Sequence, residues 1–442
     1  MKKILAIVVI LLAAAIASAP YINGIVMEKI VRQAQGDVNA RYGETGSGIN
    51  VEIMNYDRSY ATSKIEWRIR LGRLGAVYGI DEILLVDHAK HGLTGVVSKT
   101  SLERNQWFTD FINTKLDGKN PLHITTFYKL TGNIESFIDI DAFSPEAEKE
   151  TVEFRPASII TEINEDFKHL TSTTTWEGFS LADKARLDGF TVKSDLKKIT
   201  TYIWQGEIDY GIDHLAVNDR QANFALNDFK GKYSLDFNRE KNTLSIGLEA
   251  ALTDLEDEKG KIQNAFARIE INNLDARGYE EFMEIYSQSM QPVLNDISNA
   301  QDDSEKMEQA MKGEMANAGL QMMTAYEKFL KKGLEILITD VHMHHPTGNI
   351  EGNLELKLNR DVTFAQLVPI VTQPGLAFDI FSLHSHLSFP EKLAGDKYNQ
   401  LISPVYPGMQ TGLFVVDGEN LVHNAETRDG KLFLNDLEVV LD

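Results

Sequence analysis

Strand-length segments with a period of two dominate this sequence from about Val51 to residue 275. Apolar and polar residues alternate in each segment, which is typical of a strand with one buried and one solvated face. The series predicts a mainly β, β-rich α+β fold with an elongated, curved antiparallel sheet, and it argues against a Rossmann-type alternation of strands with helices. Clear examples of the alternation are Lys64–Arg70, Tyr233–Phe237 and Leu244–Leu248.

One long segment, between Tyr279 and Lys332, has apolar residues at helical spacing instead. The pattern predicts helices that pack on the sheet. Seven of the chain's twelve methionines lie between Met283 and Met323. They fill the core where helix meets sheet, or they provide an adaptable apolar surface for a lipid or a partner. The candidate contacts for an apolar ligand are Met307, Met311, Met315 and Met322.

The amino terminus holds the longest apolar run. Lys2 and Lys3 precede residues 4–27, which carry no charge and begin with an aliphatic stretch. At about 1.5 Å per residue this run is about 36 Å long, enough to cross a hydrocarbon core of about 30 Å. The two lysines place the amino end in the cytoplasm by the positive-inside rule. We therefore expect an uncleaved signal-anchor with an exported body.

Two alternatives to the anchor stay open. Ala17-Ser18-Ala19 has the small-residue pattern of a signal-peptide cleavage site, although Pro20 would then be the first mature residue. The other alternative is a cytosolic protein in which the amino-terminal helix is buried. The expected organisation is an anchor at residues 1–27, a β-rich body at 28–275, a helical segment at 276–332 and a β-rich region at 333–442 that completes the body.

Charge and composition exclude several classes of function. The chain has 44 Lys and Arg residues against 65 Asp and Glu residues, a formal net charge of -21. This balance argues against nucleic acid as a partner, because such binding needs cationic neutralisation of phosphates. Cysteine is absent, which removes thiol nucleophiles, thiolate metal sites and disulfides. No nucleotide-binding glycine loop and no hydrolase or zinc-protease motif occurs, so we expect no cofactor.

The order of the parts resembles the YdgA-like bacterial envelope family, a domain of unknown function. The resemblance rests on the amino-terminal anchor and on three later stretches, which are Tyr56–Ser63, the His91-Gly92 pair after an apolar strand (with His88 as the alternative histidine), and the closing hairpin Asn424–Asn435. It implies a mostly β periplasmic protein, anchored in the bacterial inner membrane, with no established enzymatic activity. It carries no catalytic residues.

Two pairs of histidines are the strongest candidates for metal chemistry. His342 and His344 are two residues apart on a predicted strand, and His384 and His386 repeat this spacing. If the two strands pair, four imidazoles converge and can hold zinc, with Asp340 nearby. The alternative is that all four are outward polar positions of antiparallel strands.

Asp87 lies close to His88 and His91 at the end of another apolar strand. An aspartate beside a histidine is a candidate general base with its orienting group. The structural alternative is a histidine that binds a strand end and fixes the turn at Gly92.

These observations favour a non-enzymatic envelope protein that holds or guides an apolar, lipid-like ligand along a sheet groove. A structural scaffold acting as a homo-oligomer is the first alternative, and a metal-dependent enzyme using the histidines is the second. The expected partners are the inner membrane, through residues 4–27, and lipid.

Overall fold

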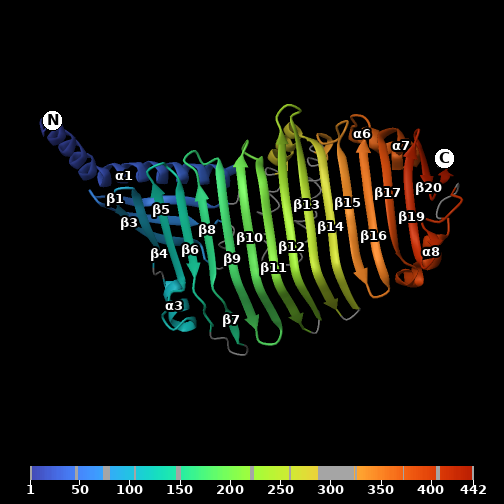
Figure 1. Ribbon diagram of the computed structural model, residues 1–442, viewed down its shortest axis with the longest axis horizontal. Helices are drawn as coiled ribbons and strands as arrows, with labels where there is room; N and C mark the ends of the chain where they lie inside the picture. The colour runs from blue at the N-terminus through green and yellow to red at the C-terminus, as the bar shows by residue number, and fades with distance from the viewer. Residues whose placement is uncertain are drawn as a thin grey trace. The chain divides into compact units, whose positions relative to one another are not determined.

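The computed structural model describes residues 2–44, 48–72, 80–103, 106–145, 151–219, 223–257, 260–286, 323, 326–371, 373–404 and 409–440. The fold is mainly β with antiparallel strands, which confirms the predicted class (Figure 1). The chain divides into two compact units. Among the described residues, unit 1 extends to Ala182 and includes Lys193–Lys198, and unit 2 comprises Asp183–Val192, Ile199–Tyr286 and residue 323 onward.

Within the described residues, unit 1 is a meander of antiparallel strands with two helices. Its strands pair in the order β1-β2-β3-β4-β5-β6-β8-β9, and β7 pairs with β9. The strands are β1 (Asn50–Arg58), β2 (Thr62–Arg70), β3 (Glu82–His91), β4 (Gly95–Leu102), β5 (Leu122–Lys129), β6 (Ile134–Ile140), β7 (Val152–Phe154), β8 (Ala157–Ile163) and β9 (His169–Leu181). The helices are α1 (Lys2–Glu44) and α3 (Gln106–Lys115).

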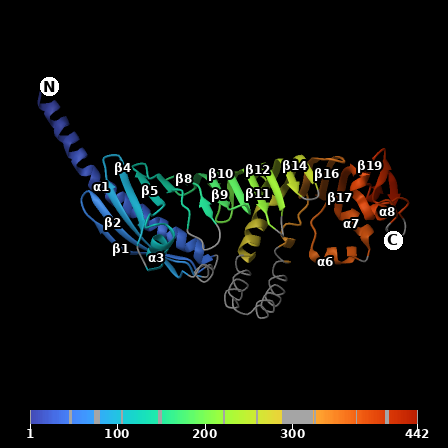
Figure 2. The same ribbon diagram turned by 90° about the horizontal axis from the view of Figure 1, so that it is seen from below.

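Helix α1 provides the core of unit 1 together with the first strands. It continues through Pro20 and lies along β1, β3 and β4 (Figure 2). Met27 is fully buried, and it packs in one cluster with Val31 of the same helix and with Ile65, Ala89 and Val96 of the strands. Since these apolar side chains leave water when the helix docks, their burial holds α1 on the sheet.

The structure changes the interpretation of residues 4–27 as an anchor. Asn23 and Met27 lie in the core of unit 1, so the second part of that segment belongs to the folded body. Within the residues that the structure describes, no helix combines the length and the apolar character needed to cross a membrane. The side chains of residues 2–15 lie outside this description.

Unit 2 is a second antiparallel meander with longer strands. They pair in the order β11-β12-β13-β14-β15-β16-β17-β19-β20-β21, and β18 pairs with β19. The strands are β11 (Trp204–Asn218), β12 (Asn223–Asn238), β13 (Thr243–Asp257), β14 (Gly260–Asp275), β15 (Glu335–His345), β16 (Gly348–Leu358), β17 (Phe381–Pro390), β18 (Val415–Asp417), β19 (Asn420–Arg428), β20 (Lys431–Leu434) and β21 (Leu437–Val439). Strand β10 (Ala185–Lys198) has residues in both units.

Short helical pieces cover part of unit 2. They are a helix at 276–286, α6 (Phe364–Leu367), α7 (Ala377–Ile380) and α8 (Tyr398–Ile402), with the 3-10 turns η1 (Val368–Val371), η2 (Pro374–Leu376) and η3 (Glu391–Lys397). The helix at 276–286, α6 and α7 lie on the same side of the strands (Figure 2). Tyr279 and Phe329 pack on the core cluster of Leu235, Leu244 and Leu274. The predicted packing of the helical segment on the sheet is thus confirmed at these residues.

Met307, Met311, Met315 and Met322 lie outside the described residues.

Candidate functional site

The strand register of unit 2 aligns apolar residues from strand to strand. Tyr233, Leu248 and Ile269 are direct cross-strand neighbours on β12, β13 and β14, and the row continues through Ile338 to Leu354. A second row consists of Leu235, Ile246, Ile271, Ile336, Leu356 and Leu383. Because directly opposed residues lie on the same face of a sheet, the two rows form one apolar face.

Only one end of this apolar face is covered by the described helices. Leu244 on β13 is fully buried against the cluster beside the helix at 276–286. Leu248 lies four residues further along the same strand face, about 13 Å away. It is 45% exposed, and its cross-strand neighbour Ile269 is 37% exposed. Leu248 and Ile269 therefore form an exposed apolar pair on adjacent strands.

The opposite face of unit 2 is polar, and the candidate histidines lie on it. Strand β16 separates β15 from β17, so the assumed pairing of the two histidine strands is wrong. His342 is opposite Glu351, and His384 is opposite Glu355. The alternation of glutamates with apolar residues along β16 puts these carboxylates, and therefore the histidines, on the solvated face.

Three of these histidines have local hydrogen-bond partners. His342 Nδ1 lies 2.8 Å from Asp340 Oδ1, and His386 Nδ1 lies 2.8 Å from Asn424 Oδ1. His344 is bonded to Asn349, across the turn of the hairpin. Among the described residues, no group of three or more His, Asp or Glu side chains is arranged to hold a metal ion.

A buried polar cluster lies under α1 in unit 1. Ser63 Oγ and His91 Nε2 share a hydrogen bond of 2.8 Å, and both residues are less than a tenth exposed. Asn23 of α1 donates to the carbonyl of Gly92 at 2.7 Å. A Cβ on Gly24 would lie 2.3 Å from the His91 ring, so only glycine permits this approach of helix to strand. His91 therefore fixes α1 on the sheet.

Asp87 forms a separate buried group on the same strand. Trp67 Nε1 donates to Asp87 Oδ2 at 2.9 Å, and the Thr100 hydroxyl donates to Oδ1. Four residues separate Asp87 from His91, about 13 Å along a strand, so they do not form the base and orienter considered from the sequence. Burial raises the pKa of the Asp87 carboxyl and lowers the pKa of the His91 imidazole. Both shifts favour the neutral form of the side chain.

The Asp87→Asn variant is expected to gain stability relative to the native protein as the pH rises. The native carboxyl binds its proton more tightly when folded, so unfolding becomes easier as the pH increases from the ordinary value of 3.8 towards neutrality. Asparagine does not titrate; its oxygen still accepts from Trp67, and its amide donates to the Thr100 hydroxyl. Urea unfolding of both proteins across this pH range measures the difference, and a difference independent of pH contradicts it.

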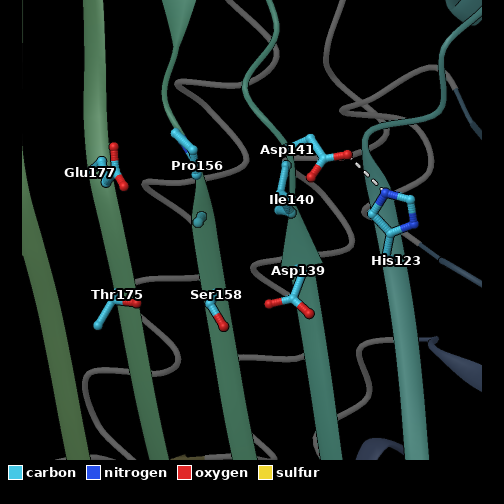
Figure 3. Close-up of a pocket in the computed structure, with 9 residues that line it drawn as sticks. His123, Asp139, Ile140, Asp141, Pro156, Ser158, Thr175 and Glu177 are labelled. Atoms are coloured by element: carbon cyan, nitrogen blue, oxygen red, sulfur yellow. Dashed lines mark hydrogen bonds and ion pairs between the residues drawn. The ribbon is translucent and has the colours of Figure 1, made fainter.

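An open hollow lies on the strands of unit 1. It has a volume of about 490 Å³ and is lined by residues of β5, β6, β8 and β9. Asp139, Ser158 and Thr175 lie side by side on three strands, while His123 points to Asp141 at 2.9 Å (Figure 3). Both partners of this ion pair are more than half exposed, so solvent weakens it. The hollow is open to solvent.

The whole chain, residues 1–442, matches the family model described as "Bacterial protein of unknown function (DUF945)". The chain belongs to the DUF945 family. No curated protein and no solved structure gives a significant match. The resemblance found in the sequence is therefore confirmed at the level of this family.

Two of the stretches that carry the family resemblance meet in the DUF945 fold. Tyr56–Ser63 covers the end of β1 and its turn to β2, and His91-Gly92 ends β3. The Ser63–His91 hydrogen bond joins them directly beneath α1. His91 is buried whereas His88 is exposed, so His91-Gly92 is the structurally important pair. Sequence reasoning missed its bond to Ser63, because nothing local links residues 28 positions apart.

Proposed function

We propose that this DUF945 protein is a non-enzymatic, membrane-anchored envelope protein that binds a lipid-like amphiphile on the apolar face of unit 2. The single observation that carries the proposal is the cross-strand row through Tyr233, Leu248 and Ile269, with Leu248 and Ile269 left partly exposed beyond the helical cover. An acyl chain laid along these residues removes apolar surface from water, worth about 25 cal/mol per Å².

A row of polar side chains at the far end of this face favours an amphiphile, and not a pure hydrocarbon, as the ligand. His214, Asn227 and Asp254 are cross-strand neighbours, joined by hydrogen bonds of 2.6 and 2.7 Å. Alternation along β13 places Asp254 on the face of Leu248, six residues away, or about 20 Å. A chain on the apolar rows can therefore direct its head group to hydrogen-bonding side chains.

The amino-terminal part of α1 supports the anchor and the inner-membrane location. Lys2 and Lys3 precede the aliphatic residues, and the core of unit 1 contains Asn23 and Met27. The anchor proposed here is accordingly residues 4–22, about 28 Å of helix. The positive-inside rule then puts the two units in the periplasm.

Photo-crosslinking in membranes with a diazirine analogue of palmitic acid tests the ligand proposal. In the full-length protein we expect label on peptides that contain Leu248 and Ile269. The Leu248→Glu and Ile269→Glu double variant is expected to reduce this label about ten-fold or more, because a carboxylate on the apolar face must be desolvated when the acyl chain binds.

Lys230→Glu is the matched control, since it introduces the same side chain at an exposed position opposite Ala251 on the polar face. It is expected to keep the label. Label confined to residues 4–22 in all three proteins contradicts ligand binding by unit 2.

A further inference from the structure

Three turns of unit 1 each present one large apolar side chain to solvent. They connect β1 to β2, β3 to β4, and β5 to β6, and their apolar residues are Tyr60, Leu93 and Leu130. These side chains are 54%, 53% and 51% exposed. Turn positions normally carry small or polar residues, so an exposed apolar residue in each of three neighbouring turns requires an explanation.

All three turns lie at the same end of the sheet. In an antiparallel meander every second turn lies at the same end of the strands. These three turns are the first, third and fifth connections between β1 and β6. Backbone hydrogen bonds join them: His91 N donates to Ala61 O at 2.8 Å, and Leu130 N approaches Thr94 O at 3.4 Å. The three apolar side chains therefore lie on one continuous surface at this end of the strands.

Helix α1 lies next to these turns. Asn23 binds Gly92 in the second turn, and the Arg58 guanidinium lies 5.2 Å from the centre of the Tyr21 ring. Ile22 and Ile25 are 48% and 43% exposed beside these contacts. From here α1 extends beyond the strands of unit 1 towards the amino terminus (Figure 1).

We propose that the turn surface, formed by Tyr60, Leu93 and Leu130 with Ile22 and Ile25, inserts into the interfacial layer of the bilayer that holds the amino-terminal anchor. This inference rests on the proposed anchor at residues 4–22. Apolar and aromatic side chains on a rigid edge gain stability when they leave water at the acyl boundary, about 5–10 Å below the surface.

An exposed lysine next to the turn surface fits a membrane containing anionic lipid. Lys90 flanks the second turn and is exposed, while Arg58 and Lys129 beside the other two turns are ion-paired with Glu28 and with Glu135 and Glu162. The next turn at the same end of the strands joins β8 to β9 and contains the exposed residues Glu165 and Asp166. The turn surface that contacts the membrane ends before this acidic turn, because anionic head groups repel carboxylates.

The absence of cysteine from the chain allows a direct test of this depth. The full-length Leu93→Cys protein is labelled with the fluorophore NBD and reconstituted in vesicles of phosphatidylethanolamine and phosphatidylglycerol with doxyl-labelled lipid. We expect a blue-shifted emission and about two-fold quenching, since the label sits within the depth reached by interfacial side chains. Lys119→Cys is the control: it precedes β5, about 25 Å of strand from Leu130, and is expected to show neither effect.

The possible outcomes separate this inference from the anchor. If the protein floats with the vesicles but the label at position 93 behaves like that at position 119, the turn surface does not contact lipid and the anchor stands. If the protein does not float with the vesicles, both proposals fail. Quenching at position 93 that disappears in the Leu130→Asp and Tyr60→Asp background shows that the three turns insert together.

Discussion

Met27→Ala is expected to destabilise unit 1 by about 2–5 kcal/mol. The side chain is fully buried and packs with Val31, Ile65 and Val96, so truncation removes contacts from both the helix and the strands. The truncation leaves a cavity. Helix α1 cannot move to fill it without breaking the close contact between Gly24 and the His91 ring. Native-state hydrogen exchange of β2 and β3 in the full-length protein measures the loss as faster exchange in these strands.

Ile25→Ala is the matched control for Met27. Ile25 lies two residues earlier on α1 and is 43% exposed, so its truncation is expected to change the stability by about 0.5 kcal/mol or less. If Met27 spanned the membrane instead, the two substitutions would have equal effects on exchange in β2 and β3. Equal effects would therefore overturn the placement of residues 23–27 in the folded body.

Leu244→Ala is expected to lower the stability of unit 2 by about 2–5 kcal/mol, since Leu244 is fully buried between the sheet and the helix at 276–286. Leu248→Ala, on the same face of the same strand, is expected to cost about 1 kcal/mol or less because this side chain is 45% exposed. Hydrogen exchange of β12 to β14 in the two full-length variants measures both.

This pair also tests whether the apolar face is open. A cost at Leu248 equal to that at Leu244, in protein stripped of lipid, would show that protein covers the face along its length. The proposed lipid site would then be contradicted even before crosslinking. A large difference between the two variants leaves the face accessible to an acyl chain.

Local pattern predicted the secondary structure of this chain well. The period-two segments form strands: Lys64–Arg70 lies in β2, Tyr233–Phe237 in β12 and Leu244–Leu248 in β13. Alternation and turn chemistry depend on residues a few positions apart, so they can be read without knowledge of the rest of the fold. The short helices α6 and α7 had no comparable signal, because four residues do not display a helical period.

The predicted metal site was wrong about which strands are neighbours in the sheet. Two histidine pairs with matching spacing suggested convergence, but spacing along a strand does not say which strands are neighbours. Strand β16 lies between β15 and β17, and the histidines face its glutamates across the polar surface. Whether histidines 42 positions apart, such as His342 and His384, converge depends on the order of the strands in the sheet.

Composition and short-range periodicity make the protein mainly β, acidic, free of cysteine and apolar at its amino terminus. Which of these residues meet depends on the tertiary structure. It buried Met27 in unit 1, joined Ser63 to His91 beneath α1, and aligned Tyr233, Leu248 and Ile269 in one apolar row. Each of these contacts depends on strand register and helix docking, which are long-range and therefore invisible in any short window of sequence.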